Sequence, residues 1–126
     1  MESLENQWYE ELPLQCPPAD AIPANGNFYR IAQDVPTKDN DYFSQRKLNP
    51  LKTFEGIDEC ILRSVSVFSS IEEASKRLLL PKFRNNKIVI VRLTPKDGVI
   101  KKTFGPCHYS WWRTKEFDYY QVNLAL

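Results

Sequence analysis

Short runs of β-branched and aromatic residues recur along this chain, and none of them is longer than eight residues. Runs of this composition predict strands at 28–32, 65–68, 87–93, 99–103 and 117–124. Two stretches between them, 54–64 and 71–80, repeat their apolar residues at helical spacing. Because the helices interrupt the strands without regular alternation, we expect an α+β fold: a mostly antiparallel sheet of four to six strands with two main helices.

Local patterns make this prediction more specific. Alternation along 28–32 places Phe28, Arg30 and Ala32 on one face of their strand. Thr53 is the expected cap of the first helix. Ser69 or Ser70 caps the second, with an acidic residue three positions further on. The turn at 94–98 lies between two β-branched runs and therefore predicts a hairpin of 87–93 with 99–103.

The length of 126 residues fits one domain, 1–126, which can bury a core without a metal or a disulfide. Hydrophobic residues make up 42% of the chain and aromatic residues 13%, which is enough large apolar surface for that core. The first 27 residues are rich in proline but also contain Trp8 and Tyr9. A disordered tail would be poorer in aromatic residues, so we expect an ordered arm packed on the core.

Charge and cysteine content limit the partners and the compartment. The 17 Lys and Arg residues nearly balance the 16 Asp and Glu residues, so nucleic-acid binding through a broad basic field is not indicated. The opening residues do not resemble a signal peptide, and the apolar run 88–91 is too short to cross a membrane. Three cysteines at wide spacing do not form a disulfide framework. These features predict free thiols and a cytoplasmic location.

The cysteines and the one histidine are the residues that could bind a metal ion or act as a nucleophile. Cys16, Cys60, Cys107 and His108 supply the four soft ligands that a structural zinc ion requires. Only Cys107 and His108 are close in sequence, however, so we expect no metal site. Cys107 or Cys60 could form a nucleophile pair with His108, but sequence neighbours rarely reach that geometry and no third orienting group is evident.

The segment 105–113 has the most unusual composition. Two readings remain open for it. Either the two tryptophans cover the two faces of the sheet, or the segment is a loop whose aromatic and basic side chains bind a protein or a small ligand. Scattered lysines and arginines from 82 onward are expected to be a solvated face. Within the segment 105–113, the candidate binding residues are His108, Tyr109, Trp111, Trp112 and Arg113.

Several motifs resemble those of a group of small uncharacterised bacterial proteins. The motifs are the opening W-Y-x-E-L-P-x-x-C-P-P at 8–18, then F-Y-R at 28–30, S-V-F at 66–68 and H-Y-S-W-W at 108–112. This resemblance covers most of the chain and implies no function.

A second resemblance concerns the layout of the chain. Arg30 on the first strand, Ser66 on a later strand and a helix directly after that strand are similar to the layout of ADP-ribosyltransferase-like folds. The resemblance implies that Arg30 binds the phosphates of NAD, that Ser66 lines the nicotinamide pocket, and that a late carboxylate stabilises the positive charge on the ribose. Glu116 or Asp118 would have to supply that carboxylate, and neither lies in the family's usual motif.

Two functional hypotheses follow. The first is a non-catalytic module, without a cofactor, that binds an unidentified protein or small ligand. The alternative is an ADP-ribosyltransferase-like enzyme that uses NAD. The two differ in the role of Arg30, which the second hypothesis requires to share a cleft with Ser66. The oligomeric state is left open.

Overall fold

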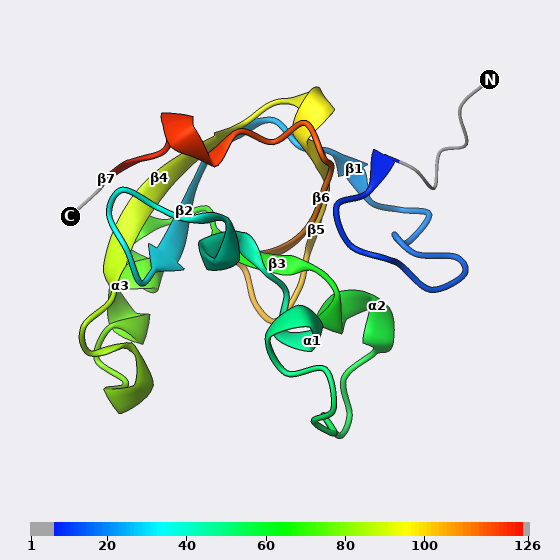
Figure 1. The fold of residues 1–126 in the computed structure, drawn as a ribbon, viewed down its shortest axis with the longest axis horizontal. Helices are drawn as coiled ribbons and strands as arrows, with labels where there is room; N and C mark the ends of the chain where they lie inside the picture. The colour runs from blue at the N-terminus through cyan, green and yellow to red at the C-terminus, as the bar shows by residue number, and fades with distance from the viewer. Residues whose placement is uncertain (1–6, 125–126) are drawn as a thin grey trace.

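A computed structural model describes residues 7–124 of the chain, and it confirms the α+β class and the mostly antiparallel sheet (Figure 1). The described residues form one seven-stranded sheet of order β1-β5-β6-β3-β2-β4-β7, in which every neighbouring pair is antiparallel. The strands are β1 (Ile22–Pro23), β2 (Gly26–Ala32), β3 (Val65–Phe68), β4 (Lys87–Leu93), β5 (Gly98–Lys102), β6 (His108–Arg113) and β7 (Asn123–Leu124).

The sheet curls into a ring because one segment of chain joins two of its regions. β1 pairs with β5, and only two residues later the same segment continues as β2, which pairs with β3 and β4. Strands β5, β6, β3 and β2 therefore surround a common interior (Figure 1).

Helices are short and lie outside the ring. They are α1 (Gln45–Leu48), α2 (Glu59–Leu62) and α3 (Ile71–Arg77), with 3-10 turns η2 (Asp39–Tyr42), η3 (Pro81–Phe83), η4 (Pro95–Asp97) and η5 (Tyr119–Gln121). The predicted cap of α3 is confirmed, since the Ser70 side chain accepts a hydrogen bond from the Glu73 backbone N–H at 3.3 Å.

Alternation along the strands separates two apolar clusters. The larger cluster fills the ring and includes Phe28, Val67 and Trp111. The smaller cluster, built on Phe68, Ala74 and Ile88, lies between the outer face of the sheet and α3. The predicted faces of β2 are correct, because Phe28 and Ala32 face the ring interior while Tyr29 packs against the outer cluster.

Three predicted elements differ from the structure. The 94–98 turn does not close a hairpin: β4 pairs with β2 and β7, whereas β5 pairs with β1 and β6. In that turn the Asp97 carboxylate accepts hydrogen bonds from the Thr94 N–H and hydroxyl at 2.8 and 3.0 Å, and the chain then crosses to the other side of the ring.

The other two differences also have local causes. The helix expected at 54–64 is reduced to α2, because Gly56 adopts a φ of +75° that a helix cannot contain, and Asp58 rather than Thr53 stands at its N-terminus. The strand expected at 117–124 is reduced to β7, because the Asp118 carboxylate accepts a hydrogen bond from the Tyr120 N–H at 2.9 Å and starts η5.

The expectation of free thiols is wrong for two cysteines. Cys16 and Cys60, 44 residues apart, form a disulfide that ties the N-terminal arm to α2, and Cys107 is the free cysteine. The disulfide removes one of the grounds for the predicted cytoplasmic location, since disulfides persist mainly in oxidising compartments. No helix within residues 7–124 has the length and apolar character needed to span a membrane.

The described part of the arm contacts the ring. Trp8 forms a β-bridge with Thr114, and the Tyr9 hydroxyl donates a hydrogen bond to Asp39. The guanidinium carbon of Arg113 lies 3.8 Å from the centre of the Tyr9 ring. Desolvation and the Asp39 carboxylate raise the pKa of Tyr9 to about 12.

Candidate ligand-binding cavity

The structure contains a cavity of about 520 Å³ on the outer face of the sheet. Most of the residues that line it come from β2, β3 and β6, from α3 and η3, and from the segment between η2 and α2. Three of the residues proposed from the sequence line it, namely Arg30, Ser66 and His108. Arg30 and Ser66 therefore line one cavity, but their side chains project from opposite faces of the sheet, which is the arrangement that argues against the transferase hypothesis.

Arg30 reaches this cavity through a gap between two strands. Alternation places its side chain on the inner face and that of Ser66 on the outer face. The two residues meet because β2 and β3 form only one pair, Tyr29 with Phe68, and then diverge. Nη1 of Arg30 donates to the Ser66 backbone oxygen at 2.8 Å, and Nε donates to the Asp41 backbone oxygen at 3.0 Å. The guanidinium thus replaces hydrogen bonds that the divergence of the strands removes.

Burial lowers the pKa of Arg30 to about 10, against the opposing influence of Tyr42 and Asp41. The side chain therefore remains a cation at neutral pH. Since its two bonded nitrogens both serve backbone carbonyls, Arg30 stabilises the junction of β2 with β3 and contributes positive potential to the cavity.

Two further cations lie at the rim. Arg77 at the end of α3 has its guanidinium carbon 5.6 Å from the centre of the Phe68 ring, and Lys82 of η3 has its ammonium 5.0 Å from the centre of the Phe83 ring. Both side chains are exposed. Asp41 is the one carboxylate among the residues that line the cavity. It accepts hydrogen bonds from the backbone N–H groups of Gln33 and Lys38 at 2.7 and 2.9 Å, so much of its acceptor capacity is used locally.

His108 lies between two phenylalanine rings. Its ring centre is 5.2 Å from that of Phe68 and 5.5 Å from that of Phe104. Burial lowers the pKa of His108 from its ordinary value of 6.5, the Thr103 backbone oxygen opposes this, and Arg77 and Arg30 lower it further. The ring is therefore uncharged at neutral pH.

Phe104 has unusual backbone geometry at the rim. Its φ is +54°, a left-handed conformation that non-glycine residues seldom adopt, and 64% of its surface is exposed. Side chains in such conformations are held by their surroundings and occur often at ligand-binding positions. Phe104 forms an aromatic wall beside His108, and Phe54, Phe68 and Phe83 supply the remaining aromatic lining.

The other residues proposed from 105–113 do not form an exposed surface. This segment is not a loop: it contains β6, which lies between β5 and β3. Trp111 and Trp112 are fully buried on opposite sides of the strand, and their indole N–H groups donate to the backbone oxygens of Asp97 and Cys60 at 3.0 and 2.9 Å. The reading in which the tryptophans cover the two faces of the sheet is the correct one.

Arg113 and Tyr109 face the ring interior rather than the cavity. Arg113 is buried, donating to the Tyr42 backbone oxygen at 3.2 Å and to the Asp39 carboxylate at 3.1 Å. Tyr109 is half-buried and packs edge-on against Phe28, with ring centres 5.5 Å apart. Both residues therefore contribute to the core in this structure.

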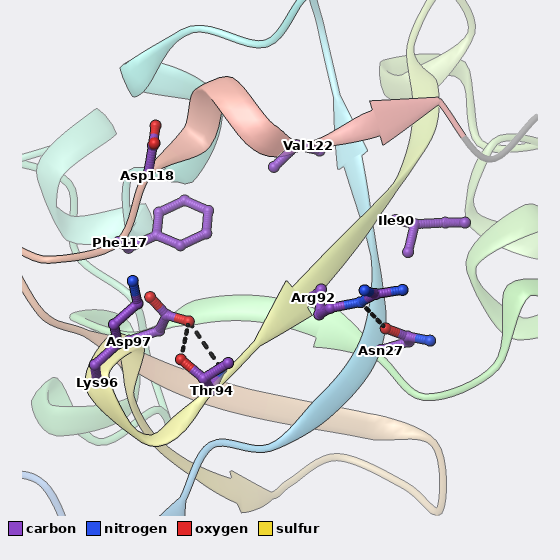
Figure 2. Close-up of a pocket in the computed structure, with 9 residues that line it drawn as sticks. All are labelled: Asn27, Ile90, Arg92, Thr94, Lys96, Asp97, Phe117, Asp118 and Val122. Carbon is purple, nitrogen blue, oxygen red and sulfur yellow. Dashed lines mark hydrogen bonds between the residues drawn. The ribbon is translucent and has the colours of Figure 1, made fainter.

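The carboxylates required by the transferase hypothesis lie elsewhere. Asp118 lines a second cavity, of about 400 Å³, which lies between β4 and the segment that precedes η5 (Figure 2). Glu116 is exposed and lines neither cavity. In the second cavity Arg92 donates to Asn27 at 3.2 Å (Figure 2). The structure does not bring Glu116 or Asp118 together with Arg30 and Ser66.

Arg77, Lys82 and Phe104 were not singled out as site residues from the sequence. Lys82 was noted only as part of a solvated face, and the three residues lie on separate elements whose packing the sequence does not show. Phe104, next to Gly105 in a turn, was the one position with a local signal. Within residues 7–124, no group of three or more His, Cys, Asp or Glu side chains is placed to hold a metal ion.

Comparisons with known proteins add no information on the function of this cavity. The resemblances noted in the sequence remain predictions. No protein-family model, no curated protein and no solved structure matches this chain.

Proposed function

We propose that this domain is a non-catalytic module that binds a small anionic ligand with an aromatic or other apolar part. The observation that carries the proposal is the convergence of three cations with four phenylalanines on the larger cavity, with a single carboxylate among its lining residues. Ligand cavities of several hundred Å³ are typically apolar, with a few polar groups that orient the ligand.

Each part of the lining has a distinct role in this proposal. Arg77 and Lys82 are exposed at the rim, where they meet an incoming anion, and the planar guanidinium of Arg77 suits two oxygens of a phosphate or carboxylate. Phe54 and Phe104, which both line the cavity, supply apolar contact for the rest of the ligand. Arg30 supplies positive potential from the sheet that forms the floor of the cavity, and it keeps its hydrogen bonds to the backbone oxygens of Asp41 and Ser66.

This proposal is the small-ligand form of the first hypothesis, and the geometry favours it over the NAD-dependent alternative and over protein binding through the tryptophans. NAD-dependent transfer needs a carboxylate beside the bound sugar, and the two candidates lie outside the cavity that contains Arg30. Recognition of a protein through Trp111 and Trp112 needs exposed tryptophans, and both are buried.

The proposal is tested by titration with small probes that separate charge from ring. Phenyl phosphate carries both features, inorganic phosphate carries only the charge, and phenol carries only the ring. We expect phenyl phosphate to bind most tightly and to shift the amide resonances of residues around the cavity in a ¹⁵N-labelled protein. Absence of binding by any of the three would contradict the proposal.

Two matched variants locate the site. Arg77→Met removes a cation from the larger cavity, and Arg92→Met removes one from the second cavity with the same change in charge. A hydrogen bond to a charged group contributes about 1.5–3 kcal/mol, so Arg77→Met should weaken phenyl phosphate binding by about tenfold or more. Arg92→Met should leave it unchanged. Equal losses in both variants would show attraction by overall charge rather than a site.

A further inference from the structure

The contacts between His108 and Thr103 bear on which nitrogen of the imidazole ring carries a proton. Nδ1 lies 3.1 Å from the Thr103 backbone oxygen and 3.0 Å from its hydroxyl oxygen. The Thr103 hydroxyl can donate or accept a hydrogen bond, whereas the backbone oxygen can only accept one, so the two contacts together favour a proton on Nδ1. The Thr103 hydroxyl is also 2.9 Å from that of Ser110, which gives it a second partner. With Nδ1 protonated, Nε2 is the nitrogen of the neutral ring that carries no proton.

Nε2 is an acceptor that the folded chain does not use. His108 lines the cavity, and no hydrogen bond reaches Nε2 from residues 7–124. This nitrogen is open to the cavity rather than sealed from solvent, since within residues 7–124 Arg113 Nε is the buried side-chain atom that lacks a partner. A ligand that donates to Nε2 replaces its hydrogen bond to water, whereas a ligand without a donor loses that bond. The cavity otherwise offers cations, which are donors only, and His108 adds the opposite hydrogen-bonding character.

The charges around the ring keep it an acceptor. Arg77 faces it from α3 and Arg30 from β2, while β3 contributes the uncharged Phe68. Both arginines disfavour a second proton on the ring. The remaining titratable groups of the cavity are Lys82 of η3 and Asp41 of η2, and the half-buried Cys107 precedes His108 in the chain.

We propose that Nε2 of His108 is the specificity-determining acceptor of this cavity, and that it selects anionic aromatic ligands whose ring bears an N–H or O–H donor. This inference rests on the function proposed above. Phosphorylated compounds with an amino-substituted ring, such as nucleotides, have this combination: phosphate for Arg77 and Lys82, a ring for the phenylalanines and an amino group for Nε2.

The first test needs no ligand. The chain contains one histidine, so ¹⁵N-histidine labelling gives a spectrum with only two ring nitrogens. We expect a protonated Nδ1 and an unprotonated Nε2 at pH 7.5. A ring protonated at Nε2, or at both nitrogens, would overturn the inference.

The second test compares probes that differ by one donor. AMP has a ring amino group that purine riboside 5′-monophosphate lacks, and 4-aminophenyl phosphate differs from phenyl phosphate in the same way. We expect the amino member of at least one pair to bind about tenfold more tightly to the wild-type protein at pH 7.5. This advantage should disappear as the pH is lowered through the pKa of His108, because the protonated ring cannot accept.

Variants separate the two proposals. His108→Leu should reduce each pair to equal affinity while leaving the phosphate-dependent part, and His108→Gln, which restores a side-chain acceptor, should recover part of the difference. Arg77→Met should weaken both members alike. If both members of each pair bind equally to the wild type, the role of His108 is refuted and the binding function stands. If none of the probes binds, the proposed function fails and the inference fails with it. Thermal unfolding of each variant shows whether its fold is retained.

Discussion

Gly98, the first residue of β5, is the position where the structure makes its most quantitative prediction. Its φ is +135°, outside the range that residues with a Cβ normally adopt. A Cβ built on this residue would lie 2.1 Å from the Trp112 backbone oxygen and 3.0 Å from the Trp111 indole nitrogen. Replacement by alanine therefore meets both an unfavourable backbone conformation and a steric clash.

The two costs can be estimated separately. A backbone conformation of this kind costs about 1–3 kcal/mol when a side chain is present. Forcing extra volume into a packed site costs a further 1–3 kcal/mol or so, and the contact here is with backbone that cannot rotate away. Gly98→Ala should thus lower the free energy of unfolding by about 2–6 kcal/mol, out of a total near 5–15 kcal/mol for a domain of this kind.

Gly105 provides the matched control. Its φ is +131°, almost the same as that of Gly98, but a Cβ there would have no atom within 4 Å. Gly105→Ala should cost only the backbone contribution. The difference between the two variants in urea unfolding then measures the clash with the Trp112 carbonyl. Equal losses at the two positions, or a stable Gly98→Ala protein, would refute this packing of β5 against β6.

Three further predictions concern single groups. Reduction of the Cys16–Cys60 disulfide opens a 44-residue loop, and the added chain entropy of the unfolded state should lower the free energy of unfolding by about 4 kcal/mol. Urea unfolding with and without a thiol reductant measures this loss. A protein with both Cys16→Ser and Cys60→Ser should not respond to the reductant. Arg113→Met removes the cation beside the half-exposed Asp39, which keeps its hydrogen bond from Tyr9, and should cost about 2–3 kcal/mol, below the usual loss for a fully buried pair. A loss within about 0.5 kcal/mol in chemical unfolding would contradict this. Folding lowers the pKa of His108 below its value in the unfolded chain, so at pH values between the two the unfolded state binds more protons than the folded state. The free energy of unfolding should therefore fall as the pH drops below about 6.5. Thermal unfolding between about pH 5 and 7.5 measures this dependence, which His108→Gln should remove.

Local signals in the sequence were sufficient where an element is determined by its own residues. The strand at 65–68 and the Ser70 cap of α3 depend on β-branched content and on one side chain, and both were predicted correctly. The two faces of β2 follow from alternation alone. The residues involved carry the whole signal, so no knowledge of the rest of the fold was needed.

Pairing between distant segments could not be predicted in this way. The turn at 94–98 has the same composition whether it closes a hairpin or carries the chain across a ring, and only the pairing of β1 with β5 distinguishes the two. The disulfide has the same character, since 44 residues separate its cysteines and their approach depends on the path of the arm. For Trp111 and Trp112 the sequence leaves a loop and a strand equally open, because the preceding Gly-Pro is typical of a turn although the strand begins only two residues later.

The candidate cavity shows why overall charge is a poor guide to a site in this protein. The net charge of +1 predicts no preference for anions, but the folded chain distributes its charges unevenly. Glu59 is bound by two arginines of its own neighbourhood, and Asp39 is bound by Arg113. Within residues 7–124, Arg77 and Lys82 have no ion-pair partner, so their charge remains available at the cavity rim.

A net charge counts paired and unpaired groups alike, whereas a ligand responds only to the groups that the fold leaves unpaired beside it. The same reasoning applies to hydrogen bonds. His108 is the one histidine of the chain, and the sequence shows only that it is present. Its contact with Thr103 occupies one ring nitrogen and leaves the other to the cavity. Specificity in this cavity is therefore expected to depend on the groups that internal pairing has left over, and those groups are identified only once the partners of every neighbouring side chain are known.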